Sequence, residues 1–298
     1  MGICAMGALR AGSILAGFMV LTVPLMPVQA ALVRLSPAGA RRFPHWYHKK
    51  VCRLLGVRLS IEGAVVPDVP VLLVSNHTSW LDIPVLSAVA PVSFVGKKEV
   101  AGWPFVSALA RLQRTVFVDR ERRAAAGEAA GEIMSRLEAG DTIVLFAEGT
   151  SSDGNRVLPF KTSLFAAAKP TARGGGNAPS KRDAVVQTLS IVYKRLHGVP
   201  IGRADRAIVG WYGDMEMTSH AWALLKAGPL DVTIRISPPV SLDAFSDRKE
   251  LAARSEAEVR EHVVRILRDR PAAEPVEVAP PEDRGSSAPP KAQGAKWR

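Results

Sequence analysis

The stretch Val71-Leu72-Leu73-Val74-Ser75-Asn76-His77-Thr78-Ser79-Trp80-Leu81-Asp82 indicates both how this chain folds and where its chemistry lies. Its apolar start, bounded by Pro70, is typical of a short buried strand, and we expect Thr78 or Ser79 to cap a helix that continues through Leu86. His77 is therefore predicted at the mouth of a strand-to-helix turn. Asp82 is placed to accept a hydrogen bond from one ring nitrogen, which leaves the other nitrogen free to take a proton from a substrate hydroxyl.

The same spacing also fits a histidine with a purely structural role, so the rest of the chain decides between the two interpretations. A chain of 298 residues favours one large domain with an ample core. Its two cysteines, Cys4 and Cys52, have no paired spacing, which argues against a disulfide framework or a cysteine-based metal site. The His-Glu-x-x-His pattern of zinc hydrolases and the Gly-x-Ser-x-Gly elbow of serine hydrolases do not occur in the sequence. We therefore predict no metal site.

The chain is strongly basic, and its charge is unevenly distributed. Its 39 Lys and Arg residues against 28 Asp and Glu residues give a net charge of +11 at pH 7. The segment 34–58 contains basic residues and no acidic ones, namely Arg34, Arg41, Arg42, Lys49, Lys50, Arg53 and Arg58. A nucleic-acid-binding protein can be this basic, but the sequence has no zinc-finger spacing, RNA-binding aromatic pair or obvious recognition helix. We expect an anionic membrane surface as the partner, and no nucleic acid.

An apolar segment directly precedes this basic cluster. No charged residue occurs from Ala11 to Val33, a stretch long enough for a tilted span of a bilayer core about 30 Å thick. We interpret residues 1–33 as a retained membrane anchor and residues 34–60 as a basic juxtamembrane segment that follows the positive-inside rule. This places the remaining chain on the cytoplasmic face of the cell inner membrane. A re-entrant or interfacial hairpin and a cleaved secretory signal are the alternatives.

Beyond the anchor, apolar runs alternate with helix-length segments, which predicts an α/β fold. Strands are expected over residues 57–61, 71–74, 92–95, 115–118, 142–146, 185–192, 207–211 and 230–236. Helices are expected over residues 83–90, 105–112, 122–139, 219–227 and 248–268. The glycine-rich segment 170–182 is predicted to be a loop, and residues 271–298, rich in Pro, Ala and Glu, a disordered tail.

Further polar residues follow the ends of expected strands, where active-site groups gather in open α/β sheets. In the segment 146–151, Glu148 can bind a ligand hydroxyl or a neighbouring cation, Gly149 permits close backbone approach, and Thr150 supplies a hydroxyl. The segment 116–120 ends in Arg120, whose planar fork of donors fits phosphate, and Lys97 ends another strand. Each segment alone also fits an ordinary turn or a surface ion pair.

In order and residue type, these segments resemble the motifs of the glycerolipid acyltransferase family, to which 1-acylglycerol-3-phosphate acyltransferases belong. The family carries Asn-His-x-x-x-x-Asp, a Lys-x-Glu-Leu-like segment, Phe-hydrophobic-x-Arg and Phe-Pro-Glu-Gly-Thr-Arg. The corresponding residues are His77 and Asp82, Lys97 and Glu99, Phe117 and Arg120, then Phe146, Glu148, Gly149 and Thr150, with Phe160 and Lys161 downstream. The resemblance covers roughly residues 53–240 and implies a mixed, mostly parallel sheet flanked by helices. We assign the acyltransferase domain to residues 61–270.

The resemblance also implies a reaction. A fatty acyl group passes from a thioester, on coenzyme A or acyl carrier protein, to a hydroxyl of a membrane lysolipid, and no further cofactor is needed. His77 is expected to be the general base and Asp82 its orienting partner. The expected substrate-binding residues are Lys97, Arg120, Glu148, Gly149, Thr150 and Lys161. Lys97 is expected to stabilise oxyanion charge or bind phosphate, and Arg120, Glu148, Gly149 and Thr150 to hold the acceptor's polar head. Lys161 belongs to the family's Phe-Lys element and is a cation that could help to bind a phosphate.

Two departures from the family pattern bear on the acceptor. Ala147 replaces the family's proline, and Ser151 replaces the arginine after the threonine, which removes one phosphate ligand. We expect 1-acylglycerol-3-phosphate as the acceptor and phosphatidic acid as the product. O-acylation of lyso-ornithine lipid, whose head carries no phosphate, is the alternative. A non-catalytic lipid-binding membrane protein is a second alternative, although such a protein would not need the pair His77 and Asp82.

Overall fold

A single sheet forms the centre of the computed structural model, which describes residues 2–119, 123–167 and 184–269. Its strands follow the order β1-β8-β6-β2-β5-β3-β4, with β7 and β9 also pairing with β6. They are β1 (Val57–Glu62), β2 (Val71–Ser75), β3 (Ser93–Lys97), β4 (Val116–Val118), β5 (Thr142–Phe146), β6 (Val185–Leu196), β7 (Val199–Pro200), β8 (Leu230–Ile236) and β9 (Val240–Ser241). β7, β8 and β9 run antiparallel to β6, whereas the other pairings are parallel. The predicted mixed, mostly parallel sheet is confirmed.

Parallel pairing brings the sequence motifs to one edge of this sheet. β2 and β5 end together, with Ser75 opposite Phe146, and β3 and β4 end together, with Lys97 opposite Val118. β3 lies beside β5 in the same direction. The four segments that leave these strands, and that carry the predicted site residues, therefore start from the same edge.

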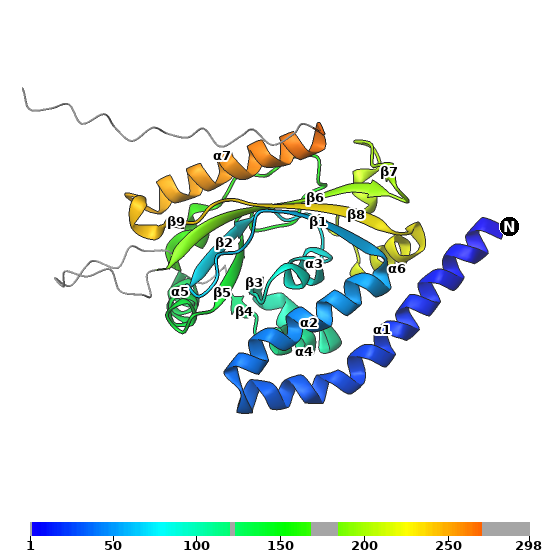
Figure 1. The fold of residues 1–298 in the computed structure, drawn as a ribbon, viewed down its shortest axis with the longest axis horizontal. Helices are drawn as coiled ribbons and strands as arrows, with labels where there is room; N and C mark the ends of the chain where they lie inside the picture. The colour runs from blue at the N-terminus through cyan, green and yellow to red at the C-terminus, as the bar shows by residue number, and fades with distance from the viewer. Residues whose placement is uncertain (1, 120–122, 168–183, 270–298) are drawn as a thin grey trace, which may run out of the picture.

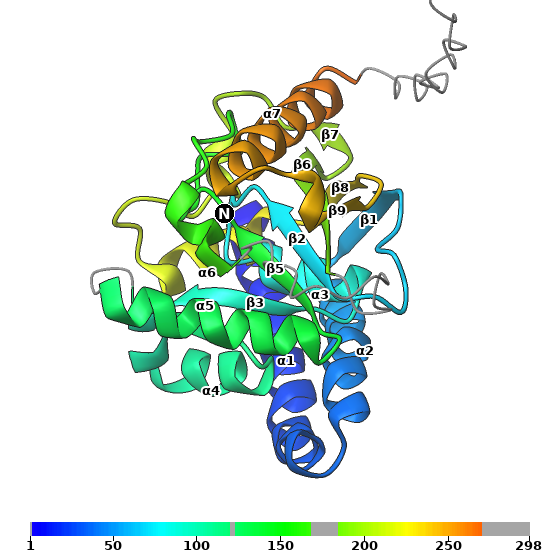
Figure 2. The ribbon, with the colours of Figure 1, turned by 90° about the vertical axis from the view of Figure 1, so that its left-hand side faces the viewer.

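Helices cover both faces of the sheet (Figures 1 and 2). They are α3 (Asp82–Val89), α4 (Pro104–Leu112), α5 (Arg123–Glu138), α6 (Met217–Ala227) and α7 (Arg248–Leu267), with short 3-10 helices η1 (Lys98–Gly102), η2 (Thr162–Ala167), η3 (Arg206–Ile208) and η4 (Leu242–Ala244). One apolar cluster packs under α5 and α7, and a second packs under α3 and α6. Each face of the sheet therefore has its own core, as expected for a layered α/β domain.

Two long helices, α1 (Gly2–Leu35) and α2 (Pro37–Leu55), precede the sheet and pack against each other (Figure 1). Ser36 caps α2 by accepting the amide of Gly39, and Gly56 ends it in the left-handed conformation at φ +76°. Within the described part of the chain, α1 is the one helix long and apolar enough to cross a membrane, over Ala5–Leu35. Only 17% of the residues in its most apolar 18-residue stretch are buried.

Polar side chains nevertheless attach α1 to the body. Arg10 donates to the carbonyl of Leu55 at 3.1 Å, and the hydroxyls of Thr22 and Tyr47 lie 2.7 Å apart. Gln29 donates to the carbonyls of Ala40 at 3.0 Å and Leu112 at 2.9 Å. The outer face of α1 exposes apolar residues that include Leu9, Val20, Val23 and Leu35. α1 thus lies along the body and presents an apolar face outward.

The structure corrects several sequence predictions. The strand expected over 207–211 is wrong, because the amides of Val209 and Gly210 both donate to the carbonyl of Arg206 at 3.0 Å, which gives a helical turn. The strand expected over 57–61 is confirmed as β1, whereas β6 continues to Leu196, beyond the end expected at residue 192. Helical α2 was not predicted. The expected loop 170–182 and tail 271–298 lie outside the described residues.

Candidate active site

His77 lies just after β2, and the side chain of Asn76, the residue between them, continues the hydrogen bonding of the sheet. The side-chain NH₂ group of Asn76 donates to the backbone carbonyl of Ile191 at 3.0 Å. The side-chain oxygen of Asn76 accepts the backbone N–H of Ile191 at 2.9 Å. This exchange imitates a backbone ladder and ties the end of β2 to β6. His77, the next residue, is therefore held at a fixed place on the edge of the sheet.

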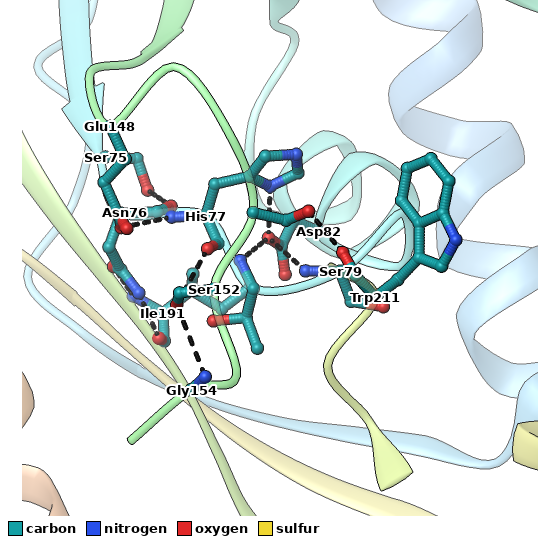
Figure 3. Close-up of polar contacts among 12 residues, drawn as sticks. Ser75, Asn76, His77, Ser79, Asp82, Glu148, Ser152, Gly154, Ile191 and Trp211 are labelled. Carbon is teal, nitrogen blue, oxygen red and sulfur yellow. Dashed lines mark hydrogen bonds and ion pairs between the residues drawn. The ribbon is translucent and has the colours of Figure 1, made fainter. Parts of the chain in front are cut away.

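Asp82 lies beside the His77 ring, as the spacing predicts (Figure 3). The His77 Nδ1 atom is 2.7 Å from Asp82 Oδ2, and the Asp82 side chain is fully buried whereas 17% of the His77 side chain is exposed. A carboxylate beside Nδ1 favours the tautomer with its proton on that nitrogen, which leaves Nε2 as the acceptor. The pair therefore has the geometry of an oriented general base.

Asp82 also accepts hydrogen bonds from the turn before it. The amides of Thr78 and Ser79 donate to Oδ2 at 2.7 and 3.1 Å. The prediction that Thr78 or Ser79 caps the helix is therefore wrong. α3 begins at Asp82, and the Asp82 side chain accepts the amides of the turn that precedes it. These donors stabilise a buried charge that would otherwise be costly.

Tyr193, on β6, supplies a partner that was not predicted. Its hydroxyl donates to Asp82 Oδ1 at 2.6 Å, and the residue is only 5% exposed. Burial, and then the charge of Asp82, raise the pKa of Tyr193 well above its ordinary value, so the hydroxyl keeps its proton and remains a donor. The available signal was the tyrosine itself, since a buried tyrosine hydroxyl requires a hydrogen-bond partner.

An aromatic ring fixes the plane of the His77 imidazole. Phe146, the last residue of β5, stacks on it with ring centroids 4.0 Å apart and an interplanar angle of 17°. The ring of Phe94 in turn stacks with that of Phe146, with centroids 6.0 Å apart and an interplanar angle of 12°. The imidazole is thus constrained both by the Asp82 hydrogen bond and by a stack rooted in the sheet.

Glu148 joins the loop after β5 to the loop after β2. Its Oε1 atom accepts the amide of His77 at 2.9 Å, its Oε2 atom accepts the amide of Leu158 at 3.0 Å, and the residue is 1% exposed. Burial raises the pKa of Glu148 to about 8, against the opposing effect of the two amide donors. Both oxygens contact backbone of this chain, whereas the sequence predicted a contact with the acceptor.

The rest of this loop is fastened to the same region. Gly149 is buried and has φ +73°, a conformation that favours glycine. Ser152 donates its amide to the carbonyl of His77 at 2.9 Å. Ser151, which stands where the family has an arginine, donates its hydroxyl to the carbonyl of Trp211. Position 151 therefore makes an internal contact and supplies no cation.

The other predicted binding residues are exposed or lie outside the described residues. Thr150 and Lys161 are exposed, and the amide of Lys161 donates to the carbonyl of Ala147 at 2.8 Å. Lys97 is exposed at the end of β3. Arg120 falls outside the described residues. Across residues 2–119, 123–167 and 184–269, no group of three or more His, Cys, Asp or Glu side chains is placed to hold a metal ion.

Comparisons with known proteins show the family to which this chain belongs. A family model described as Acyltransferase matches residues 57–192. The lyso-ornithine lipid O-acyltransferase of Brucella abortus (strain 2308) is 46% identical over 85% of this chain and 94% of its own length. That of Rhizobium meliloti (strain 1021) is 41% identical over 83% of each chain. The 1-acyl-sn-glycerol-3-phosphate acyltransferase of Neisseria gonorrhoeae is 37% identical over 36% of this chain and 42% of its own.

A solved structure has the same fold. The crystal structure of the 1-acyl-sn-glycerophosphate (LPA) acyltransferase from Thermotoga maritima superposes with a TM-score of 0.61, covering 90% of this chain and 98% of that one. Its sequence identity is 23%, so the likeness concerns the fold alone.

Proposed function

This chain belongs to the acyltransferase family, and we propose that it transfers a fatty acyl group from a thioester to the free hydroxyl of lyso-ornithine lipid. The similarity to lyso-ornithine lipid O-acyltransferases carries the proposal, because it extends over 85% of this chain at 46% identity. The similarity to a 1-acyl-sn-glycerol-3-phosphate acyltransferase extends over 36%. The alternative acceptor of the sequence analysis is thereby preferred over 1-acylglycerol-3-phosphate.

Position 151 supports the same choice. An acceptor with a phosphate head needs cations around it, and arginine is well suited to that task. Ser151 places a hydroxyl there and uses it to bond the Trp211 carbonyl. A head without phosphate does not require the missing guanidinium.

The reaction uses the free nitrogen of His77. As the acceptor hydroxyl attacks the thioester carbonyl, His77 Nε2 takes its proton, and Asp82 stabilises the positive charge that forms on the ring. The C–S bond then breaks, and the departing sulfur takes the proton from His77 to leave as a thiol. General-base assistance of this kind contributes about 10²- to 10⁴-fold to the rate, to which positioning adds.

Glu148 is assigned a positioning role in this scheme, in place of the direct acceptor contact expected from the sequence. Its side-chain carboxyl group holds the backbone of His77 by accepting the His77 amide. Gly149, Thr150, Lys97, Lys161 and Arg120 keep their proposed role in binding the substrates. Coenzyme A and acyl carrier protein both fit as the thioester carrier.

The outer face of α1 supports a place at the membrane, where the acceptor resides. Exposed apolar residues such as Leu9 and Val20 suit the boundary between lipid headgroups and acyl chains. The basic residues of α2 would add attraction to anionic lipids, which fits the proposed cytoplasmic face of the inner membrane. Because Thr22 and Gln29 bind the body, α1 fits the interfacial alternative better than a free span.

The test is an acyl-transfer assay with the membrane form of the protein. Wild type, His77→Ala and the control His197→Asn, whose side chain is exposed, are incubated with acyl-CoA or acyl carrier protein thioesters and a set of lysolipids. We expect acylated lyso-ornithine lipid, by mass spectrometry, from wild type and the control only. Product from 1-acylglycerol-3-phosphate alone would replace the acceptor, and no His77-dependent product would overturn the enzymatic role.

A further inference from the structure

Two tryptophans from distant parts of the chain meet beside the candidate site. The rings of Trp103 and Trp211 are in edge-to-face contact, with centroids 6.1 Å apart and an interplanar angle of 75°. Trp103 lies between η1 and α4, and Trp211 lies between η3 and α6. Neither ring takes part in the hydrogen-bond network of His77.

The order of strands in the sheet shows which segments this ring contact joins. Trp103 belongs to the segment that leaves β3, whereas the amide of Trp211 donates to the carbonyl of Thr78, the residue after His77, at 2.9 Å. Between β6 and β3 lie β2 and β5, whose ends carry His77 and Glu148. The two tryptophans therefore bridge segments from either side of the strands that carry the candidate site.

An apolar surface leads from α1 to this bridge. Trp103 and Phe105 are each 37% exposed, and the ring of Phe105 contacts that of Phe18 on α1, with centroids 6.4 Å apart. On the other side, Trp211 donates its ring N–H to the carbonyl of Met215 at 2.8 Å. With that polar group satisfied by the chain itself, the rest of the indole is available for apolar contact.

We propose that Trp103 and Trp211 form an aromatic portal, through which the apolar chain of the lysolipid acceptor passes from the membrane-facing surface of α1 to His77. The inference rests on the proposed function and names a specificity device for it. An indole offers a large apolar surface with few rotatable bonds, so the pair favours acceptors whose chain is long enough to reach both rings. The contact between the two rings is edge-to-face and involves no covalent bond or charge, so the rings can part as the chain enters.

The test compares acceptors of different chain length. Wild type, Trp103→Ala and Trp211→Ala are assayed with short-chain and long-chain lyso-ornithine lipids in the same mixed micelles. We expect kcat/KM for the long-chain acceptor to fall about tenfold through a higher KM, because apolar contact area is lost. The short-chain value and kcat should stay near wild type, and Trp211→Phe should restore much of the preference.

Trp222→Ala is the matched control, since Trp222 is 41% exposed on α6 and lies outside the portal. Its chain-length preference should equal that of wild type. If both portal variants fold, by thermal unfolding, and keep the wild-type preference, the portal is wrong although the acyltransferase function stands. If wild type shows no His77-dependent transfer to any lysolipid, the proposed function itself has failed.

A second readout does not depend on turnover. A long-chain lyso-ornithine lipid with a photoreactive group at the end of its chain is irradiated with the protein, and the labelled peptides are identified. Labels on the segments around residues 103 and 211, reduced by excess unlabelled lipid, support the portal. Competed labels elsewhere, with none on these segments, would overturn it.

Discussion

Within the described part of the chain, Asp82 receives hydrogen bonds from four groups, and one of these belongs to His77. This arrangement makes Asp82→Asn an informative substitution. The asparagine oxygen can occupy the place of Oδ2 and accept the amides of Thr78 and Ser79, while its NH₂ group donates to the Tyr193 oxygen. The turn can therefore persist, whereas the negative charge beside His77 is lost.

We expect kcat of Asp82→Asn to fall about 10²- to 10⁴-fold, the range for loss of general-base assistance. Steady-state acyl transfer measures this loss, and thermal unfolding shows whether the fold is kept. A variant that unfolds like wild type and also transfers like wild type would refute the oriented-base role of Asp82. A large decrease in Tm together with the loss of activity would instead show that Asp82 mainly stabilises the fold.

Tyr193→Phe tests the remaining donor to Asp82. Removing the hydroxyl leaves Asp82 Oδ1 buried without that hydrogen bond, which should lower the free energy of unfolding by about 1–3 kcal/mol. We expect kcat to fall about tenfold with KM within about twofold, because the carboxylate orients the base less firmly but substrate contacts are kept. Tyr47→Phe is a matched control that loses a hydroxyl contact with Thr22 far along the chain from His77. Similar kcat values for both variants would exclude a positioning role for Tyr193.

Among the residues of the candidate site, the pair His77 and Asp82 can be predicted from the sequence, whereas Tyr193 cannot. His77 and Asp82 are five residues apart, so local chain geometry alone can bring them together. Tyr193 is 111 residues from Asp82, and only the pairing of β6 beside β2 brings it there. Glu148 was recognised by its motif, but its burial and amide partners depend on how two loops meet.

Among the elements, the loops after β2 and β5 are joined through the carboxyl group of Glu148, and this junction should be sensitive to pH. In the folded protein the pKa of Glu148 is raised to about 8 by burial, whereas an unfolded glutamate titrates near about 4.3. Between these values the folded state binds more protons, so this group's contribution to stability is lost as pH rises toward 8. Glu148→Gln cannot titrate and lacks this dependence.

We therefore expect the Tm of wild type relative to Glu148→Gln to fall between about pH 5 and pH 8 and to level off above about pH 9. Scanning fluorimetry across this range measures the difference. Glu138→Gln, at an exposed position at the end of α5, should show no such trend. A constant difference for Glu148→Gln would mean that Glu148 does not titrate in this window.

Element prediction succeeded where apolar periodicity was strong and failed where long-range pairing decided the outcome. β2 and β5 are continuous apolar runs, and both were predicted. The segment 207–211 is apolar enough for a strand, but Trp211 pairs with the Thr78 carbonyl rather than with a sheet. β7 and β9 have two residues each and exist only because β6 is long enough to pair with them.

For the whole molecule, the sequence predicts the fold class but not the strand order. Alternating apolar runs and helices indicate α/β, and the family resemblance, confirmed by the comparisons, supplies the mostly parallel sheet. Nothing local specifies that β8 runs antiparallel to β6 and pairs in parallel with β1. The pairing of β1 with β8 joins residues from distant parts of the chain, Val57 with Leu230, and it puts β1, which directly follows α2, at the edge of the sheet.

That surface leads to a prediction for the intact protein. Val20 on α1 is 75% exposed, so Val20→Lys adds a charge to the outer apolar face without disturbing the contacts of Thr22 and Gln29. If α1 binds lipid through this face, affinity for anionic vesicles should fall about tenfold, because a charge is costly in the acyl region. Transfer to acceptors in vesicles should fall in parallel, while transfer in detergent micelles should change little.

Val264→Lys is the matched control. Val264 is 40% exposed on α7, which lies on the opposite face of the sheet from α1 (Figure 1). Vesicle flotation should distinguish the two lysine variants, since both carry the same added charge and only one carries it on α1. Equal binding by both variants would show that α1 does not face the lipid. In that case the basic residues of α2 would have to account for membrane attachment, and binding by both variants should then decrease equally at high salt.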